Sequence, residues 1–276
     1  MSHSETTGGF RVTDCLLLAR NPLLSGLPNA VVTSVLEHGR RRHVNAKTTV
    51  IANGSVSQEL LFLLSGVVSV ITNIGDGHEW TKDIIGAGEV VGGLTMSNGR
   101  LETASVVAKQ ASFFLALPHI VFQQLVREHP SLADSVFALL EEKLQQREKF
   151  ITDVMFSHAE QRIAKGLLSA MRVFFTVQSD TQQTSTIERR NQLKLPVNVK
   201  ISQQELASMT GLSRESVNKQ LQLWLKEGLI NLSLGNVEVL MPERLSMIAK
   251  KALQMGVLSP NRRKFQNHIN PAENSV

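Results

Sequence analysis

The spacing of hydrophobic and polar positions changes along the chain, and the change separates a β-rich part from helical parts. From about Arg40 to Leu117, short β-branched runs alternate with Gly or Asn-Gly turns at intervals of about ten residues. This pattern predicts an antiparallel sandwich or barrel. The expected strands are His43–Ile51, Leu60–Leu64, Val67–Thr72, Trp80–Ile85 and Val106–Leu117.

Helical spacing flanks the β-rich part on both sides. Residues 1–20 predict an arm that ends in a short helix through Cys15, and a second helix is expected between Asn21 and Gly39. A short helix is expected after Pro118, and another helix over 159–177. A polar linker over 177–191 follows.

Residues 131–158 predict one long helix with an apolar stripe in 3-4-3-4 spacing. Such a stripe is typical of a coiled-coil seam and predicts a parallel homodimer, although a helix packed only within its own chain is the alternative. Arg147 is the one cation on this stripe: it could snorkel to solvent, pair with Glu148 or Glu142, or reach into the neighbouring roll, and snorkelling is the default expectation. The seam residues are Phe137, Leu140, Leu144, Ile151 and Val154.

The stretch from Ser202 to Gly228 predicts two short helices joined by a tight turn. Ser202 and Glu205 have the spacing of a capping box, which satisfies the free amides at a helix start. Gly211 stands where a turn between crossed helices commonly needs a left-handed backbone. A strand over Leu193–Ile201 is expected to lead into this helix pair.

The second helix, expected over 213–226, has an apolar side and a polar side. Val217, Leu221 and Leu225 recur every four residues and are expected to face the core. The polar side chains suit base edges: Arg and Lys donate to guanine, Glu accepts from cytosine and Asn pairs with adenine. A solvated polar face on an ordinary helical hairpin is the alternative. The candidate base readers are Arg214, Glu215, Asn218 and Lys219.

Beyond Gly228 the sequence predicts a two-stranded wing and then a tail. The wing strands are expected at Leu229–Leu232 and Val237–Met241, on either side of a Gly-Asn turn. The tail, 251–276, carries Arg262-Arg-Lys and is basic.

Charge is distributed unevenly over the chain of 276 residues. Residues 1–156 hold 13 Lys and Arg against 15 Asp and Glu, whereas 157–276 hold 16 against 9. A basic C-terminal part beside a near-neutral N-terminal part favours a polyanion-binding module joined to a regulatory one. The single cysteine, Cys15, excludes an internal disulfide and a four-cysteine cluster, and it favours a reducing cytoplasm. No apolar run is long enough to predict a membrane span.

The order of roll, long helix and winged helix-turn-helix resembles the Crp/Fnr family of bacterial transcription factors, which includes the catabolite activator protein. The most specific part is Ile201-Ser-Gln-Gln-Glu-Leu-Ala with Thr210-Gly-Leu-Ser-Arg-Glu-Ser-Val-Asn-Lys. The resemblance implies an α+β fold with an N-terminal antiparallel β-roll like a cyclic-nucleotide-binding domain. It divides the chain into an arm (1–20), the roll (21–130), a dimerisation helix (131–158), a winged helix-turn-helix domain (159–250) and a tail (251–276).

The resemblance also implies a function. The family's Arg, Glu and Arg base contacts match Arg214, Glu215 and Lys219, and the residues that match its phosphate contacts are Gln203, Ser213 and Ser216. A homodimer would read a pseudo-palindrome with half-sites related to TGTGA, in the docking geometry for which the catabolite activator is a standard example. RNA polymerase is the implied protein partner.

The roll departs from the cyclic-AMP binders of the family. Gly93 stands where they carry a Glu for the ribose, and Thr103 replaces the arginine that neutralises the cyclic phosphate. Arg147 and Glu148 replace small hydroxyl residues that meet the adenine. Because an unpaired phosphate in a pocket costs several kcal/mol, we expect no cyclic-AMP response; Arg147 could instead serve another anionic effector. The candidate effector pocket comprises Gly92, Gly93, Leu94, Thr103, Ala104, Arg147 and Glu148.

Other functions have weaker sequence support. His78 alone is a poor haem ligand candidate, and the cysteines of an iron–sulfur cluster are absent. No nucleophile elbow, phosphate loop or metal-ligand spacing points to an enzyme, so a non-enzymatic protein without a metal or cofactor is expected. A non-catalytic ligand-binding or protein-interaction module with a degenerate winged helix is the remaining alternative.

Overall fold

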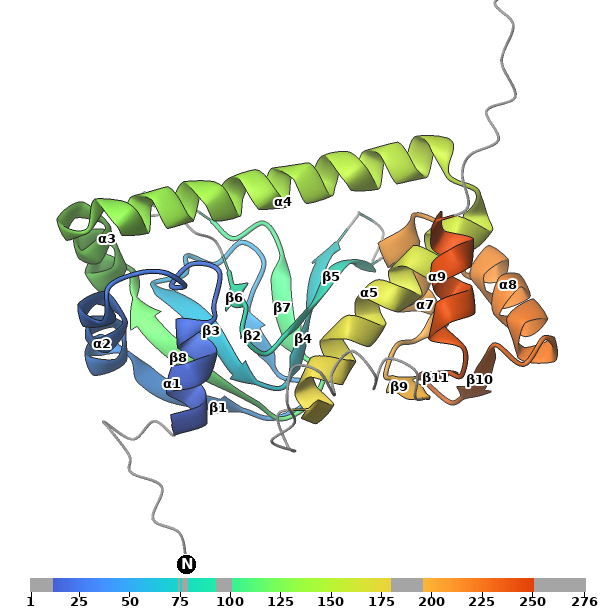
Figure 1. The fold of residues 1–276 in the computed structure, drawn as a ribbon, viewed down its shortest axis with the longest axis horizontal. Coiled ribbons are helices and arrows are strands. Elements are labelled where there is room, and N and C mark those ends of the chain that lie inside the picture. The colour runs from blue at the N-terminus through green and yellow to red at the C-terminus, as the bar shows by residue number, and fades with distance from the viewer. Residues whose placement is uncertain (1–11, 74, 76–78, 93–100, 180–195, 251–276) are drawn as a thin grey trace, which may run out of the picture.

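The computed structural model describes residues 12–73, 75, 79–92, 101–179 and 196–250. Figure 1 shows the β-roll and a small C-terminal unit lying beneath one long helix, α4 (Pro130–Phe156), which spans both of them. The N-terminal arm through residue 11, most of the linker and the tail expected at 251–276 lie outside the described residues.

The roll consists of two four-stranded antiparallel sheets with adjoining helices. The helices are α1 (Val12–Ala19), α2 (Asn29–His38) and α3 (His119–Glu128). One sheet has the order β1 (Arg40–Val44), β8 (Ser112–Pro118), β3 (Glu59–Ser65), β6 (Val90–Val91). The other has the order β2 (Thr49–Ile51), β7 (Ser105–Ala108), β4 (Val67–Asn73), β5 (Glu79–Gly86).

Strand β3 shows how the sequence builds this part of the molecule. Its side chains alternate between the two faces of the sheet, and both faces are buried. Leu60, Phe62 and Leu64 pack with the helices, whereas Leu61 and Leu63 pack between the sheets. A continuous apolar run is therefore required here, because neither face of the strand meets water.

Two of the expected strands are in fact pairs of strands. His43–Ile51 was expected as one strand but is broken between β1 and β2 by a turn in which Lys47 has φ 65°. Val106–Leu117 is likewise divided into β7 and β8. Each break bends the chain from one sheet into the other while the antiparallel pairing continues, which hydrophobic alternation alone does not reveal. The two-residue strand β6 was not expected.

The C-terminal unit is a winged helix-turn-helix behind a long helix. Its elements are α5 (Ala159–Ser179), β9 (Val197–Val199), α7 (Gln203–Thr210), α8 (Arg214–Lys226), β10 (Ile230–Ser233), β11 (Asn236–Val239) and α9 (Pro242–Lys250). The wing strands pair in the order β10, β11, β9. The expected α+β architecture of roll, long helix and winged helix-turn-helix is confirmed, and α9 is an addition to it.

Close helix contact forms the centre of the C-terminal unit. A Cβ on Gly166 of α5 would lie 2.7 Å from Thr210 Cγ2 and 3.2 Å from Leu206 Cδ1, so α5 and α7 approach at a distance that only glycine permits. On α8 the fully buried aromatic ring is Trp224, whereas Leu225, which was expected in the core, is exposed. The buried residues of α8 are Val217, Leu221 and Trp224, whose spacing of four and then three residues defines one face of the helix.

Candidate nucleic-acid interface

Both helices of the helix-turn-helix begin at side-chain caps. Ser202 Oγ accepts a hydrogen bond from Glu205 N at 3.1 Å, and Ser202 N donates to Glu205 Oε2 at 2.8 Å, so the capping box is complete. Gly211 ends α7 in the left-handed conformation, with φ 63° and ψ 37°. Ser213 caps α8 by accepting from Ser216 N at 3.1 Å. These local interactions fix the turn that separates the two helices.

The polar side of α8 is exposed in the single chain. Arg214, Glu215, Asn218 and Lys219 are all exposed, while Val217 and Leu221 on the other side are fully buried. The structure therefore brings the four candidate base readers to one open face of one helix. The cap residue Ser213 and its partner Ser216 lie at the start of the same helix and are also exposed.

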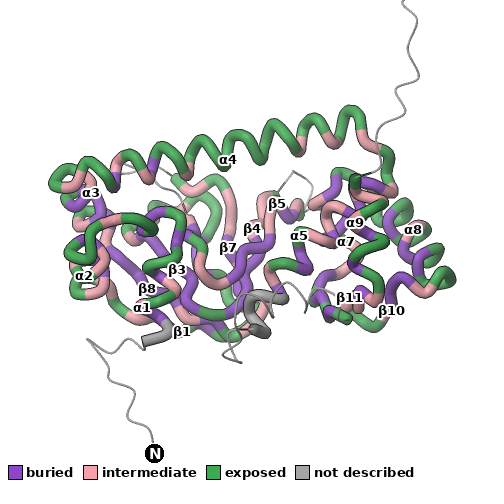
Figure 2. The backbone as a smooth tube through the Cα atoms, in the orientation of Figure 1, coloured by how far each residue is buried: buried purple, intermediate pink, exposed green. Residues whose placement is uncertain are grey.

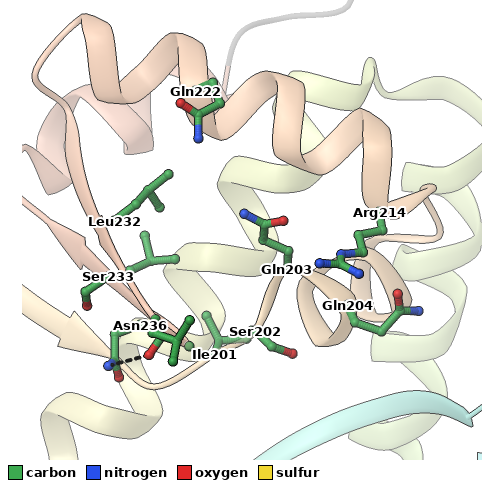
Figure 3. A pocket seen from close by; sticks show the side chains of 12 residues that line it. Ile201, Ser202, Gln203, Gln204, Arg214, Gln222, Leu232, Ser233 and Asn236 are labelled. Carbon is green, nitrogen blue, oxygen red and sulfur yellow. Dashed lines mark hydrogen bonds between the residues drawn. The ribbon is translucent and has the colours of Figure 1, made fainter.

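A groove of about 590 Å³ lies beside this face, between α8, the start of α7 and the wing (Figure 3). Arg214 reaches over the start of α7, close to Gln203 and Gln204. Because amides at a helix start and an arginine both favour anions, this groove suits a DNA phosphate. The sequence prediction did not name several residues that line this groove, from α8 itself and from neighbouring elements: Ser202, Gln204, Gln222, Ser233 and Asn236.

One hydrogen bond links two of the predicted contact residues. Gln203 Nε2 donates to Asn218 Oδ1 at 3.0 Å, which joins the start of α7 to the middle of the recognition face. Reading adenine with both atoms of an asparagine amide requires one lone pair on Oδ1 and one hydrogen on Nδ2. Because an amide oxygen has two lone pairs, Asn218 Oδ1 can keep the bond from Gln203, which orients the amide, and still accept from adenine.

Glu205 is the electrostatic centre of the helix start. Its carboxylate forms a salt bridge with Lys109 of the roll, and the side chains are only 22% and 15% exposed. Burial alone would raise the pKa of Glu205, but the hydrogen bonds from Lys109 and from Ser202 outweigh burial and lower it. The ionised carboxylate is therefore stabilised in the folded protein.

The long helix leaves most of its apolar stripe uncovered. Phe137 is 71% exposed, Leu144 61% and Ile151 56%, while Leu140 and Val154 are less exposed but also open. Figure 2 shows exposed residues along nearly all of α4, whereas most of the buried residues lie in the elements beneath it. Among the residues of α4, all of which the structure describes, only Leu132 and Val136 in the first turns are buried.

A second cavity, of about 350 Å³, lies between the roll and α4. Lys143 and Arg147 of α4 line it together with Asp83 and Glu89 of the roll. Burial raises the pKa of Asp83, and the positive charge of Arg147 partly offsets this. Burial also raises the pKa of Glu89, and the nearby charge of Asp83 adds to the effect. Arg147 lines this cavity and is also exposed, so its position between the roll and α4 is compatible with the expected contact with solvent.

Comparison with known proteins identifies the type of chain. Residues 41–129 match the cyclic nucleotide-binding domain, and residues 161–248 match the Crp-like helix-turn-helix domain. Together these matches cover the roll and the winged unit in the order described above. The chain belongs to the Crp/Fnr family.

Several relatives of this Crp/Fnr protein have been described. It is 28% identical over 219 residues to the cyclic AMP receptor protein of Thermus thermophilus, covering 79% of this chain and 92% of that one. It is 23% identical over 234 residues to a CRP-like cAMP-activated global transcriptional regulator of Mycobacterium tuberculosis, covering 85% and 99%. The c-di-GMP responsive regulator CLP of Xanthomonas campestris has the same fold, with TM-score 0.59, 20% identity and coverage of 77% and 99%.

The candidate effector residues of this Crp/Fnr protein do not all come together. Arg147 lines the cavity between the roll and α4, whereas Glu148 and Thr103 are exposed and do not line it. A Cβ on Gly92 would lie 3.7 Å from Glu102 Oε1, so a carboxylate stands beside that glycine. Ala104 is half-buried next to Thr103. Gly93 and Leu94 lie outside the described residues, as does His78.

Within the ranges that the structure describes, no helix is both long and apolar enough to cross a lipid bilayer. No three His, Cys, Asp or Glu side chains of those same residues come together as metal ligands would.

The charge of Glu205 gives the first testable prediction. Glu205→Gln keeps an acceptor for Ser202 but loses the ionic bond to Lys109, so we expect the free energy of unfolding at neutral pH to fall by about 1–3 kcal/mol. Because the pKa of Glu205 is lowered from 4.5, the wild-type advantage is complete above pH 4.5 and is lost as the pH falls through the lowered pKa.

Urea unfolding of the two proteins as a function of pH measures this difference. Glu227→Gln, which removes an exposed carboxylate at the end of α8, is the control and should change stability little. Equal losses in the two variants, or a difference that persists unchanged in acid, would contradict the assignment.

Proposed function

We propose that the protein is a homodimeric, sequence-specific transcriptional regulator that places α8 in the major groove of a pseudo-palindromic DNA site. The observation that carries this proposal is the open face of α8, where four base-compatible side chains stand beside a groove suited to phosphate. Membership of the Crp/Fnr family supports DNA binding and transcription regulation in general, and the specific site contacts are our inference.

Each predicted reader has a distinct role in this proposal. Arg214 and Lys219 donate to guanine, Glu215 accepts from cytosine, and Asn218, oriented by Gln203, contacts adenine. Lysine lacks the two-pronged guanidinium, so Lys219 discriminates guanine less strictly than an arginine would. Gln203, Ser213 and Ser216 hold phosphates and set the register without reading sequence.

The apolar stripe of α4 supports the dimer. Burial of large apolar side chains in heptad spacing is favourable, and a second copy of the same helix supplies a matching stripe. A twofold dimer also presents two recognition helices to successive major grooves, about 34 Å apart. We further propose that the dimer acts in the bacterial cytoplasm, has RNA polymerase as a protein partner and catalyses no reaction.

Cyclic AMP is not the proposed effector, although relatives are named as cAMP-activated. Thr103 supplies no positive charge at the position where the family's cyclic-AMP binders carry an arginine. Arg147 does not take the place of the missing arginine, because its positive charge already interacts with Asp83. A phosphate beside Thr103 would therefore lose its hydration without gaining a cation from that position.

Substitutions on α8 test the DNA assignment. Arg214→Ala should weaken specific binding by about 1–3 kcal/mol and relax the preference for guanine at one position of each half-site. Glu215→Ala should change the preference at a neighbouring pair. Selection of bound sites from random DNA, followed by footprinting, measures both effects.

Lys226→Ala is the matched control, since it removes an exposed cation from the far end of the same helix. An unaltered footprint for Glu215→Ala would refute its role as a reader. Binding by the unmodified protein should weaken steeply with salt; a protein-interaction module with a degenerate winged helix would show no such dependence.

A charge on the α4 stripe tests the dimer. Leu144→Glu would bury a carboxylate in the seam and should raise the dimer dissociation constant by roughly 100-fold or more. Gln145→Glu adds the same charge one position away, off the stripe, and should leave the dimer intact. Light scattering during size-exclusion chromatography measures the mass of each variant, and a monomeric unmodified protein would contradict the proposal.

Calorimetry tests the effector prediction. We expect no heat of binding when cyclic AMP is titrated into the protein at micromolar concentration, because Thr103 replaces the arginine that pairs with the phosphate in the family's cyclic-AMP binders. Micromolar binding of cyclic AMP would overturn this part of the proposal. It would leave DNA reading and dimerisation unaffected.

A further inference from the structure

The roll holds helix α7 at both of its ends. At the start of α7, Lys109 from the turn between β7 and β8 forms the salt bridge with Glu205. At the end of α7, Trp80 Nε1 of β5 donates a hydrogen bond to the carbonyl oxygen of Ser208 at 2.8 Å. The first helix of the DNA-reading pair is thus attached to a different domain by two directed interactions.

Buried apolar packing connects the same parts. Val67 and Ile84 of the roll belong to the hydrophobic core of the C-terminal unit, which includes Leu206 and Ala207 of α7. A Cβ on Gly86 of β5 would lie 2.9 Å from Val173 Cγ1 of α5, so the roll and the unit are in close contact. The roll and the C-terminal unit therefore share a continuous interface, and the bonds of Lys109 and Trp80 fix the orientation of α7 within it.

The α4 helix contacts the turn of the helix-turn-helix from a third direction. A Cβ on Gly211 would lie 3.4 Å from Val154 Cγ2 and 3.9 Å from Phe150 Cζ, both near the end of α4. Lys165 of α5 forms a salt bridge with Asp153, also near the end of α4. The orientation of the reader relative to the dimer stripe is thus fixed by the roll and by the end of α4.

None of these contacts occupies the DNA-reading face. Gln203 and Gln204 line the groove beside α8, whereas Glu205 faces the roll. The Lys109 side chain is 15% exposed and is already engaged by Glu205. Lys109 is therefore unsuited to neutralise a DNA phosphate, and docking of α7 on the roll is compatible with an open recognition helix.

We propose that Lys109 is a positioning residue for DNA binding, which acts through Glu205 and together with Trp80 holds the reader at a fixed orientation relative to α4. This inference rests on the proposed function, because orientation matters only when two readers must meet two half-sites at once. A reader that is already oriented loses less freedom on binding the second half-site. Lys109 thus contributes to binding of the whole palindrome and not to binding of one half-site.

The test compares one palindromic DNA with a half-site DNA in the full-length protein. Lys109→Met should weaken binding to the palindrome roughly tenfold, the scale of one charge-assisted hydrogen bond, and change half-site binding less than about twofold. Lys109→Arg should restore palindrome binding because it keeps the charge. Lys47→Met is the matched control, since Lys47 is an exposed cation of the roll whose amide bonds to Ala108 O, next to Lys109.

Salt dependence separates positioning from phosphate contact. If Lys109 acts through Glu205, the slope of log affinity against log salt stays the same in Lys109→Met. A lysine that touches phosphate would reduce that slope by about one. A reduced slope, equal losses on palindrome and half-site, or unchanged or tighter palindrome binding would each overturn the inference.

Fluorescence gives a readout that does not depend on DNA. The sequence has two Trp and no Tyr, so the difference between proteins with and without Trp80→Phe isolates the emission of Trp80. Trp80 emission should shift to the red in Lys109→Met, because loosening of α7 exposes the indole, and should not shift in Lys47→Met. An unshifted spectrum in Lys109→Met would overturn the inference, whether or not the protein binds DNA. A shifted spectrum in a protein that binds no DNA would count against the proposed function alone.

Discussion

A helix of 27 residues cannot hide a lengthwise apolar stripe by packing at one end, and this constraint governs the molecule. Only the first turns of α4 are fastened to the roll by fully buried side chains, yet the helix continues to the reader. Phe137, Leu144 and Ile151 remain open in the single chain. The stripe favours dimerisation, because full burial of each exposed leucine-sized side chain stabilises the buried state by about 1.5–3 kcal/mol.

Pairing through α4 would make the attachment of the reader consequential. In a dimer, the position of each recognition helix depends on the contacts that connect α8 to α4 through the intervening elements. The helix-turn-helix meets the end of α4 at Gly211 and the roll at Lys109 and Trp80. The basic C-terminal part supplies long-range attraction to DNA, which is screened and undirected, while these short-range contacts supply direction.

The sequence was most informative where a few adjacent residues determine the structure. Ser202 and Glu205 predicted the start of α7, and Gly211 predicted its end, because capping and left-handed turns depend on local residue types. The capping box and the turn are both present. The 3-4 spacing predicted α4 to within about two residues at each end, the usual uncertainty of a helix boundary.

Long-range relations were harder to predict. Nothing near Lys109 in the sequence indicates that it meets Glu205, since 96 positions separate them and the pairing depends on how two domains pack. The break between β1 and β2 was missed for a similar reason: hydrophobic alternation continues through a turn that changes sheets. Trp224 replaced Leu225 in the core because two helical positions one residue apart differ by about 100° around the axis, and packing chose between them.

The same long-range packing changes how Arg147 is understood. From sequence it is a cation on an apolar stripe, available to an anionic effector. In the structure it lies across a cavity from Asp83, so the roll already offers it a negative charge. Burial disfavours ionisation of Asp83 and Glu89, and any group that enters this cavity must be more favourable than the present arrangement of two acids and two cations. An anion would have to compete with Asp83 for Arg147, whereas a ligand with both a donor and an acceptor could engage the acids and the cations together. The charges between the roll and α4 therefore constrain an effector more tightly than the loss of the phosphate-binding arginine alone.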